Sequence, residues 1–363
     1  MKTTKRIRLS NNNKTWCYTM LAILFFLTQA NTFGQVKVNT EEKTCVECHE
    51  ETVEKDVVHG ATNECVSCHE SNGKEHPLEG VVGFKLYDEG ANLCYTCHED
   101  APVQFKKKYV HKPVKKGECA ECHEVHSSDN KNLVVANSPE LCYSCHEEFE
   151  KDRPVAMSVH NPSFENEESC SLCHTPHAST QKRLLTDKSK QLCLNCHNEE
   201  IEFEDRIIAN IEKQLDESSH LHKALKKRCT SCHNAHFSKK NVQLLKETYP
   251  TANYAKGIEE NYALCFNCHD TDLLNLEKTT TMTEFRNGDV NLHYLHINKD
   301  KGRTCTNCHD SHAANNTKLI AKTRKFGKWN MPLEFEEDEN GGSCKGCHKK
   351  LRYDRNPILE TTQ

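Results

Sequence analysis

The cysteines of this chain are arranged for chemistry: 22 of the 23 fall in C-x-x-C pairs, and a histidine follows every pair. The pairs are Cys45 and Cys48, Cys65 and Cys68, Cys94 and Cys97, Cys119 and Cys122, Cys142 and Cys145, Cys170 and Cys173, Cys193 and Cys196, Cys229 and Cys232, Cys265 and Cys268, Cys305 and Cys308, and Cys344 and Cys347. The histidines are His49, His69, His98, His123, His146, His174, His197, His233, His269, His309 and His348. Only 23 of 363 residues are histidine, so chance would place fewer than one in these eleven positions.

C-x-x-C-H is the sequence to which haem c is attached. The two thiols form thioethers with the porphyrin vinyl groups, and the adjacent imidazole binds the iron. Zinc ribbons, disulfides and redox C-x-x-C motifs also use cysteine pairs, but none of them requires a histidine after each pair. The sequence therefore predicts eleven covalently attached haems, each with its motif histidine as proximal ligand.

Twelve further histidines are candidates for the opposite face of the irons. They are His59, His76, His111, His126, His160, His177, His220, His222, His236, His293, His296 and His312. One group lies three residues after a motif histidine: His126, His177, His236 and His312. A helical offset of three residues cannot reach round a haem roughly 10 Å across, so these side chains must reach a neighbouring haem or none.

A second group of histidines follows Val or Leu and precedes the next motif by six to ten residues: His59, His111, His160, His222 and His296. We expect both groups to supply distal ligands to most of the irons, whereas His220 and His293 have no regular place. Met157, Met282 and Met331 are alternative axial ligands, although methionine more often fills gaps in packing.

The two groups define an internal repeat: upstream histidine, first motif, downstream histidine, and a second motif usually written L-C-x-x-C-H. The repeats are 59–98, 111–146, 160–197, 222–269 and 296–348. Each contains two motifs and two further histidines, so we expect each repeat to supply the distal ligands of its own two irons. In the first of them Asn72 occupies the downstream position, and we expect His76 to replace it. The motif Cys45–His49 stands alone, and His220 or His293 is available for its iron.

This repeat resembles the doubled C-x-x-C-H family of multihaem cytochromes over nearly all of residues 45–348. The family includes the pentahaem donor to cytochrome c nitrite reductase and the decahaem periplasmic cytochromes of porin–cytochrome conduits. The resemblance implies redox partner proteins: a quinol dehydrogenase or another cytochrome upstream, and a conduit or terminal reductase downstream. An eleventh motif and longer spacers in the last two repeats depart from the decahaem pattern.

The composition predicts an unusual fold. Only 36% of residues are apolar, too few for a core built from side chains alone, so the haems must form the core. We expect irregular coil with short α-helices, stacked two-haem repeats and little or no sheet, in a single domain over 35–363. One longer helix is expected at about 201–217, where apolar residues recur at helical spacing, and an insertion loop at 324–342.

The N-terminus predicts the compartment. Five basic residues and no acid precede an apolar run from Trp16 to Ala30, which is typical of a cleavable secretory signal over 1–34. The mature chain then has 43 basic and 53 acidic residues, a net charge of −10. We expect a periplasmic protein that can associate with the outer membrane and has no retained transmembrane helix. Its acidity argues against nucleic acid and favours basic patches on its partners.

These features favour an electron-transfer wire, because an iron with histidine on both faces has no open position for a substrate. The alternative is a multihaem reductase of nitrogen or sulfur oxyanions with one five-coordinate haem. Such enzymes often have a C-x-x-C-K motif, and none of the eleven motifs has lysine in that place. Electron storage without a dedicated partner is a third interpretation.

Overall fold

The computed structural model describes residues 44–165, 168–203, 206–226 and 228–356. Residues 71–85 form one compact unit, and the remaining described residues belong to a second. The expected signal peptide lies outside the described residues. Within the described ranges, no helix has the length and apolar character needed to cross a membrane.

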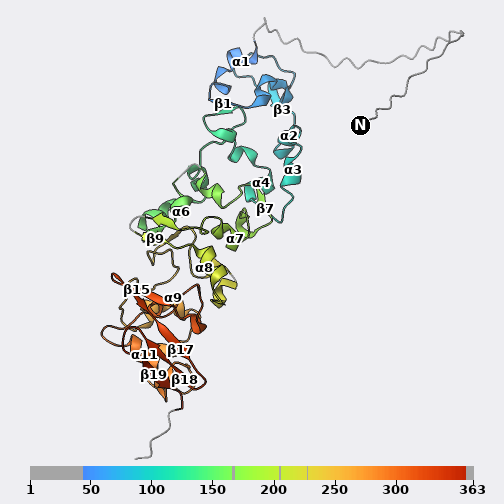
Figure 1. Cartoon of the computed structure of the whole chain (residues 1–363). Helices are drawn as coiled ribbons and strands as arrows, with labels where there is room; N and C mark the ends of the chain where they lie inside the picture. Colours follow the sequence, from blue (N-terminus) through green and yellow to red (C-terminus); the bar gives the residue numbers. More distant parts are fainter. Residues whose placement is uncertain (1–43, 166–167, 204–205, 227, 357–363) are drawn as a thin grey trace, which may run out of the picture. The chain divides into compact units, whose positions relative to one another are not determined.

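Helices in the described chain are short and are joined by long irregular segments (Figure 1). The α-helices are α1 (Cys45–Cys48), α2 (Ala91–Tyr95), α3 (Ala101–Gln104), α4 (Lys112–Lys116), α5 (Glu140–Tyr143), α6 (Glu147–Asp152), α7 (Ser189–Leu194), α8 (Ile211–Glu217), α9 (Ala263–Phe266), α10 (Asp272–Asn275) and α11 (Leu292–Ile297). In each repeat the first motif begins in a short 3-10 helix: Cys65–Ser67, Cys119–Glu121, Ser169–Leu172, Cys229–Ser231 and Cys305–Asn307.

The motif spacing explains why so many elements last a single turn. Residues at positions i, i+3 and i+4 share one face of a helical turn, so the two thiols and the imidazole of C-x-x-C-H project together. A backbone hydrogen bond closes this turn, as from His98 N to Cys94 O (2.9 Å) and from His123 N to Cys119 O (3.1 Å). Longer helices are not needed to present the three groups.

The strands are equally short, and sheet is more frequent than the sequence predicted. They are β1 (Val57–Val58), β2 (His69–Ser71), β3 (Phe84–Leu86), β4 (Tyr109–Val110), β5 (Ser127–Ser128), β6 (Ser158–Val159), β7 (Ala178–Ser179), β8 (Ile201–Phe203), β9 (Arg206–Ile208), β10 (His220–Leu221), β11 (Phe237–Ser238), β12 (Arg286–Asn287), β13 (Val290–Asn291), β14 (Ala313–Ala314), β15 (Thr323–Phe326), β16 (Trp329–Pro332), β17 (Glu334–Glu337), β18 (Gly341–Lys345) and β19 (Leu351–Asp354). Most pair in twos. The expectation of almost no sheet was therefore wrong, although the chain is mostly irregular.

Four of these sheets join consecutive repeats. The antiparallel pairs are β1 with β5, β4 with β7, β6 with β11 and β10 with β14. In each pair, one strand leads into an upstream histidine and the other follows a downstream histidine of the next repeat. A backbone bond then links the two histidines, as from His59 N to His126 O (2.7 Å) and from His160 N to His236 O (2.7 Å).

The helix expected at 201–217 is shorter than predicted. Residues Ile201–Phe203 and Arg206–Ile208 form the antiparallel pair β8 and β9, and α8 begins only at Ile211. The side chain of Asn210 accepts a hydrogen bond from Lys213 N (2.7 Å) and so caps the helix. The β-branched isoleucines before Asn210 favour strand, which explains the difference.

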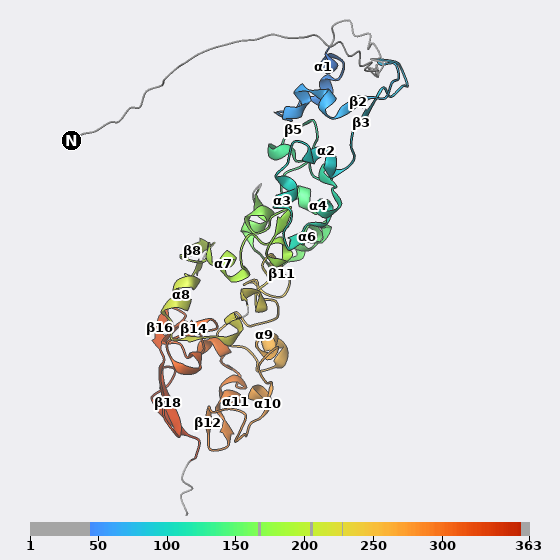
Figure 2. The same ribbon diagram turned by 90° about the vertical axis from the view of Figure 1, so that its right-hand side faces the viewer.

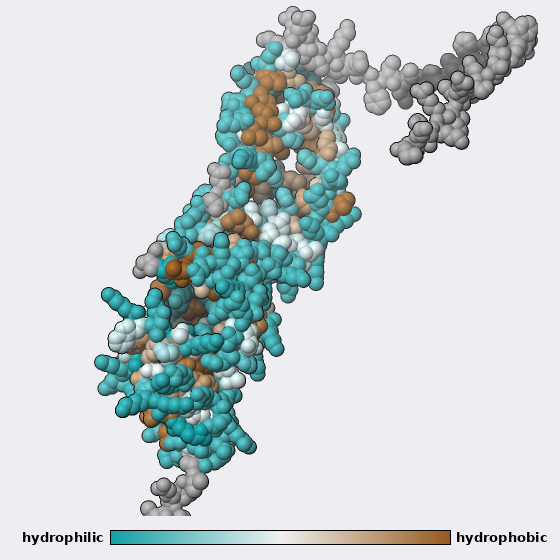
Figure 3. Space-filling view, viewed as in Figure 1, coloured by the Kyte–Doolittle hydropathy of each residue, from teal (hydrophilic) through white to brown (hydrophobic). Residues whose placement is uncertain are grey.

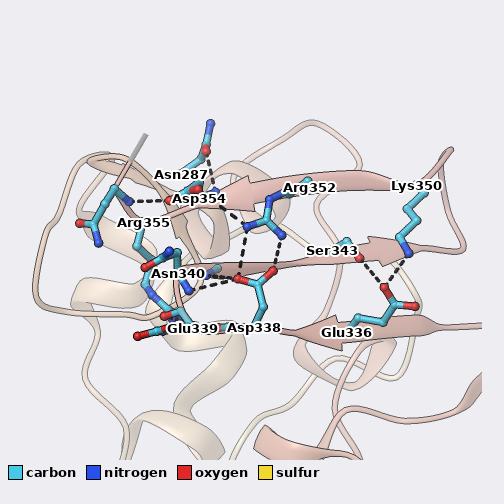
Figure 4. Close-up of polar contacts among 12 residues, drawn as sticks. Asn287, Glu336, Asp338, Glu339, Asn340, Ser343, Lys350, Arg352, Asp354 and Arg355 are labelled. Atoms are coloured by element: carbon cyan, nitrogen blue, oxygen red, sulfur yellow. Dashed lines mark hydrogen bonds and ion pairs between the residues drawn. The ribbon is translucent and has the colours of Figure 1, made fainter. Parts of the chain in front are cut away.

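The loop expected at 324–342 is also ordered as sheet. β15 and β16 form a hairpin, and β17, β18 and β19 form a three-stranded antiparallel sheet. Ion pairs cross this sheet from Lys350 to Glu336 (2.6 Å) and from Arg352 to Asp338 (Figure 4). The motif cysteine Cys344 lies on β18, so the last motif begins in a strand and not in a helical turn.

Buried apolar side chains are few, as the composition predicted. Six of them gather in two clusters, one of Leu194, Leu215 and Ala313 and one of Tyr262, Leu274 and Ile297. In the described chain every apolar residue that is buried lies at Phe164 or later. Hydrophobic residues also remain on the surface among the hydrophilic ones (Figure 3), among them Val66, which is 73% exposed between two motif cysteines. The side chains of the polypeptide alone therefore do not form a complete hydrophobic core.

Gly302 packs closely against the backbone at the end of α11. A Cβ at this position would lie 1.8 Å from the Ile297 carbonyl oxygen and 2.9 Å from that of Ala255. We expect Gly302→Ala to destabilise the protein by at least about 2 kcal/mol, because backbone and not a flexible side chain must move. Thermal denaturation followed by circular dichroism measures the loss. Gly60→Ala is the control, since nothing lies within 4 Å of a Cβ there; equal midpoints for the two variants would contradict the prediction.

Candidate haem-binding sites

Ten motif histidines each face a histidine from outside the motifs. The ring centroids of every pair are 6.0 to 6.4 Å apart. The pairs are His59 with His98, His69 with His126, His111 with His146, His123 with His177, His160 with His197, His174 with His236, His222 with His269, His233 with His312, His293 with His309, and His296 with His348.

This separation fits one metal ion between two imidazoles. Two metal–nitrogen bonds of about 2 Å and two ring radii of roughly 1 Å add up to about 6 Å between centroids. Each pair also joins one histidine that follows two thiols to one that does not, which is the donor set of a doubly ligated haem c. The residues of the ten sites therefore fit the group that the motifs imply.

The pairs follow two rules. Within a repeat, the upstream histidine faces the histidine of the second motif, as His111 faces His146. Between repeats, the histidine of a first motif faces the downstream histidine of the next repeat, as His123 faces His177. Both histidines contributed by a strand pair, such as His59 and His126, are thus held by the same small sheet.

The second rule differs from the local supply that the sequence suggested. The downstream histidines do reach a neighbouring site, as the offset argument requires, but that site belongs to the preceding repeat. His126 faces His69 although the two lie in different repeats. None of the five repeats contains all the rings of its own two sites, because the last one depends on His293, three residues before its upstream histidine.

The last repeat closes the series with a residue that the sequence left unplaced. His309 faces His293, which takes the position that a downstream histidine of the following repeat takes at the other first motifs. His293 and His296 lie three residues apart on α11, so one helix serves two sites. Asn291, fully buried, caps this helix by accepting from His293 N (2.9 Å) and Tyr294 N (3.3 Å). The spacing H-x-x-H after a capping Asn is the signal that was missed.

Other candidates lie elsewhere. His220 is exposed on β10, and none of the ring pairs found among the described residues includes it. His76 packs edge-on against Phe84, with ring centroids 5.3 Å apart inside the unit 71–85. Met157 is 56% exposed, and Met331 lies on β16 opposite Arg324.

The thiols add a second pattern, because cysteines of consecutive motifs interact in strict alternation. First cysteines meet in the pairs Cys45 with Cys65, Cys94 with Cys119, Cys142 with Cys170, Cys193 with Cys229, and Cys265 with Cys305. Second cysteines meet in the pairs Cys68 with Cys97, Cys122 with Cys145, Cys173 with Cys196, Cys232 with Cys268, and Cys308 with Cys347. Every motif is therefore linked to the one before it and the one after it.

Burial favours the neutral form of three of the facing imidazoles. Desolvation, with a smaller contribution from the opposite imidazole, lowers the pKa of His236, His293 and His312 to about 4. A neutral imidazole has a free lone pair for a metal, whereas a protonated one has none. These three rings are thus in the state that ligation requires at neutral pH.

These shifts predict a loss of stability in acid. The unfolded chain takes up protons near pH 6.5 while the folded chain resists them to about pH 4, so stability is complete above 6.5 and falls as the pH drops through this window. Each of the three imidazoles contributes up to about 3 kcal/mol. Denaturant unfolding at pH 7.5, 6 and 5 measures the decline; a midpoint that does not change between pH 7.5 and 5 would contradict it.

Comparison with known proteins finds the same repeats. The model of the doubled CXXCH motif family matches residues 59–102, 111–151, 160–202 and 222–273, each match starting at an upstream histidine. The chain is also 31% identical over 88 residues to the multihaem cytochrome MtrA of Shewanella baltica. That similarity covers 24% of this chain and 26% of the relative, so only about a quarter of either protein is compared. On these matches and its motifs, the chain belongs to the doubled CXXCH motif family, and its repeated motifs are those of a c-type cytochrome with several covalently bound haems.

Proposed function

We propose that the protein binds eleven haems and conducts electrons along them in the order of the sequence. The observation that carries this proposal is the alternating proximity of thiols, because a thiol marks the edge of the porphyrin attached to it. Motifs whose thiols are close enough to influence each other's charge would hold porphyrin edges near one another. A bound haem c supplies one exchangeable electron by alternating between ferric and ferrous iron.

The polypeptide contributes order and closure. At ten sites the paired imidazoles would hold a bound haem iron from both sides, which would leave no open position for a substrate and would limit that iron to electron exchange. The small sheets between repeats hold consecutive sites together, so the distance from one site to the next is fixed by backbone hydrogen bonds. We place this wire in the periplasm, between redox partner proteins, in line with the predicted signal sequence.

His177 offers a direct test of double ligation. In His177→Ala, the iron at the Cys119–His123 motif loses its second ligand, so we expect one high-spin ferric signal and one carbon monoxide adduct per molecule. Electron paramagnetic resonance of the oxidised protein and carbon monoxide titration of the reduced protein measure both. His177→Met, which keeps an axial ligand, should stay low-spin and rule out general misfolding.

His220→Ala is the matched control, because this histidine is exposed and the variant should give the same spin state and carbon monoxide binding as the wild-type protein. A high-spin signal of equal size in both variants, or none in His177→Ala, would overturn the ligand assignment. Strong carbon monoxide binding by the wild-type protein would point instead to a site open to substrate and to a reductase.

A further inference from the structure

The charge of the chain changes sign between its first and last motifs. Residues 45–104 contain 13 acidic and three basic residues, whereas residues 321–356 contain nine basic and six acidic ones. The mature protein as a whole is acidic. A basic region on an acidic protein orients an approaching charged partner, because the opposite ends of the charge distribution attract and repel it.

Within 321–356, the first strand of the hairpin β15–β16 is held by contacts with the rest of the protein. Phe326 and Tyr254 enclose the guanidinium of Arg303, which lies 4.9 Å and 4.4 Å from their ring centroids. Arg324, on the same strand, forms an ion pair of 2.8 Å with Asp310. The hairpin is therefore fixed beside the Cys305–His309 motif and is not a loose loop.

The tip of this hairpin carries unpaired charge and an exposed indole. Trp329, opposite Phe326 in the hairpin register, is 76% exposed. Lys322, Lys325 and Lys328 are exposed, and in the described part of the chain they form no ion pair. By contrast, Lys345, Lys350 and Arg352 of the adjacent sheet are each paired with an acid. An exposed tryptophan is typical of a protein interface, where aromatic residues are enriched, and the unpaired lysines add positive charge beside it.

The hairpin also lies against the last haem-binding motif. A Cβ at Gly346, between Cys344 and Cys347, would lie 2.7 Å from the Pro332 carbonyl oxygen and 3.1 Å from the Leu333 side chain. Pro332 is the final residue of β16, so the strand that starts at Trp329 ends on the motif. Figure 2 shows β16 and β18 on the same side of the ribbon. A protein bound at the hairpin is thus next to the eleventh site.

We propose that Lys322, Lys325, Lys328 and Trp329 form a docking surface for an acidic redox protein, which exchanges electrons with the site at Cys344–His348. This inference rests on the proposed function, since it assumes that the last motif ends a conducting series. Charge complementarity favours an acidic partner: the lysines supply attraction at long range, and the indole supplies contact area once the partner is bound. A basic partner would be repelled at this end.

The test uses the complete haem-loaded protein and an acidic flavodoxin as probe. Stopped-flow measurement of electron transfer from the reduced cytochrome should show the Lys325→Glu/Lys328→Glu variant about tenfold slower at low salt, with a weaker dependence on ionic strength. Trp329→Ala should slow the reaction while leaving its salt dependence unchanged. Lys106→Glu/Lys107→Glu changes the charge equally at another lysine run and is the matched control.

The outcomes separate the two proposals. If the wild type reduces the probe and all variants do so at the same rate, the docking surface is wrong and the electron-transfer function stands. If the control variant slows the reaction as much as the hairpin variant, only total charge matters, and the docking surface is again wrong. If the wild-type protein cannot be reduced and reoxidised at all, the proposed function itself fails.

Discussion

Without attached haem, residues 44–163 should show no protection from hydrogen exchange, while part of the later chain keeps some. The reason is the distribution of buried apolar side chains, all of which begin at Phe164 in the described chain. The earlier repeats have only haem to bury, and a chain whose core is its cofactor unfolds without it. Expression in cells that lack haem-attachment machinery, followed by hydrogen exchange with mass spectrometry, measures the difference.

Single-site variants sharpen this prediction. Cys119→Ser/Cys122→Ser removes a haem from a region without a side-chain cluster and should cost more than about 5 kcal/mol, beyond the loss of a buried Phe or Trp. Cys305→Ser/Cys308→Ser removes one beside the cluster of Tyr262, Leu274 and Ile297, which should retain partial protection. Equal protection around both vacant motifs would show that side chains, and not haems, stabilise the early repeats.

Removing one interior haem should divide the wire into two segments of predictable size. When the protein is fixed to an electrode through a C-terminal tag, Cys229→Ser/Cys232→Ser leaves only the three motifs after Cys232 on the electrode side of the gap. Fast-scan voltammetry should then detect three rapidly exchanging electrons in place of eleven, because the gap slows transfer to the other sites by orders of magnitude.

The matching control removes the lone first motif with Cys45→Ser/Cys48→Ser. In a single series this lies at the far end from the electrode, so ten electrons should still exchange rapidly. A branched network predicts ten for both variants, and that result would exclude the order inferred from the thiol contacts. Haem content measured by absorbance confirms that each variant lacks one haem.

Much of this arrangement follows from local sequence rules. The C-x-x-C-H spacing defines each helical turn, and the offset of His126, His177 and His236 from their own motifs already requires a neighbouring site. The low apolar content likewise predicts a core that side chains do not fill. These conclusions depend only on geometry within a few residues, which sequence specifies well.

The remainder depends on contacts between distant segments. Nothing in the residues near His126 indicates that it faces His69 and not a motif farther along, because two-residue strands such as β1 and β5 decide the partner. Similarly, the helical spacing of Ile207 and Ile211 is real, but Asn210 between them caps a new helix. At the other first motifs, the facing ring comes from the following repeat. His293 takes this position at His309, and the residues around His293 do not indicate that role.

Because consecutive repeats share histidine rings, the sites must be completed in a fixed order as the protein matures. The site at His174 is complete only when His236, about 60 positions later in the sequence, is available, and other first motifs depend on a later histidine in the same way. A chain that is exported from its N-terminus therefore always has one half-finished site at its growing end, and each new repeat completes the site before it. The site at His309 differs, because its partner His293, on α11, precedes it in the sequence. When the chain is truncated between two repeats, we expect the iron at the first motif of the last remaining repeat to lack its second histidine. The number of repeats before it should not change this result.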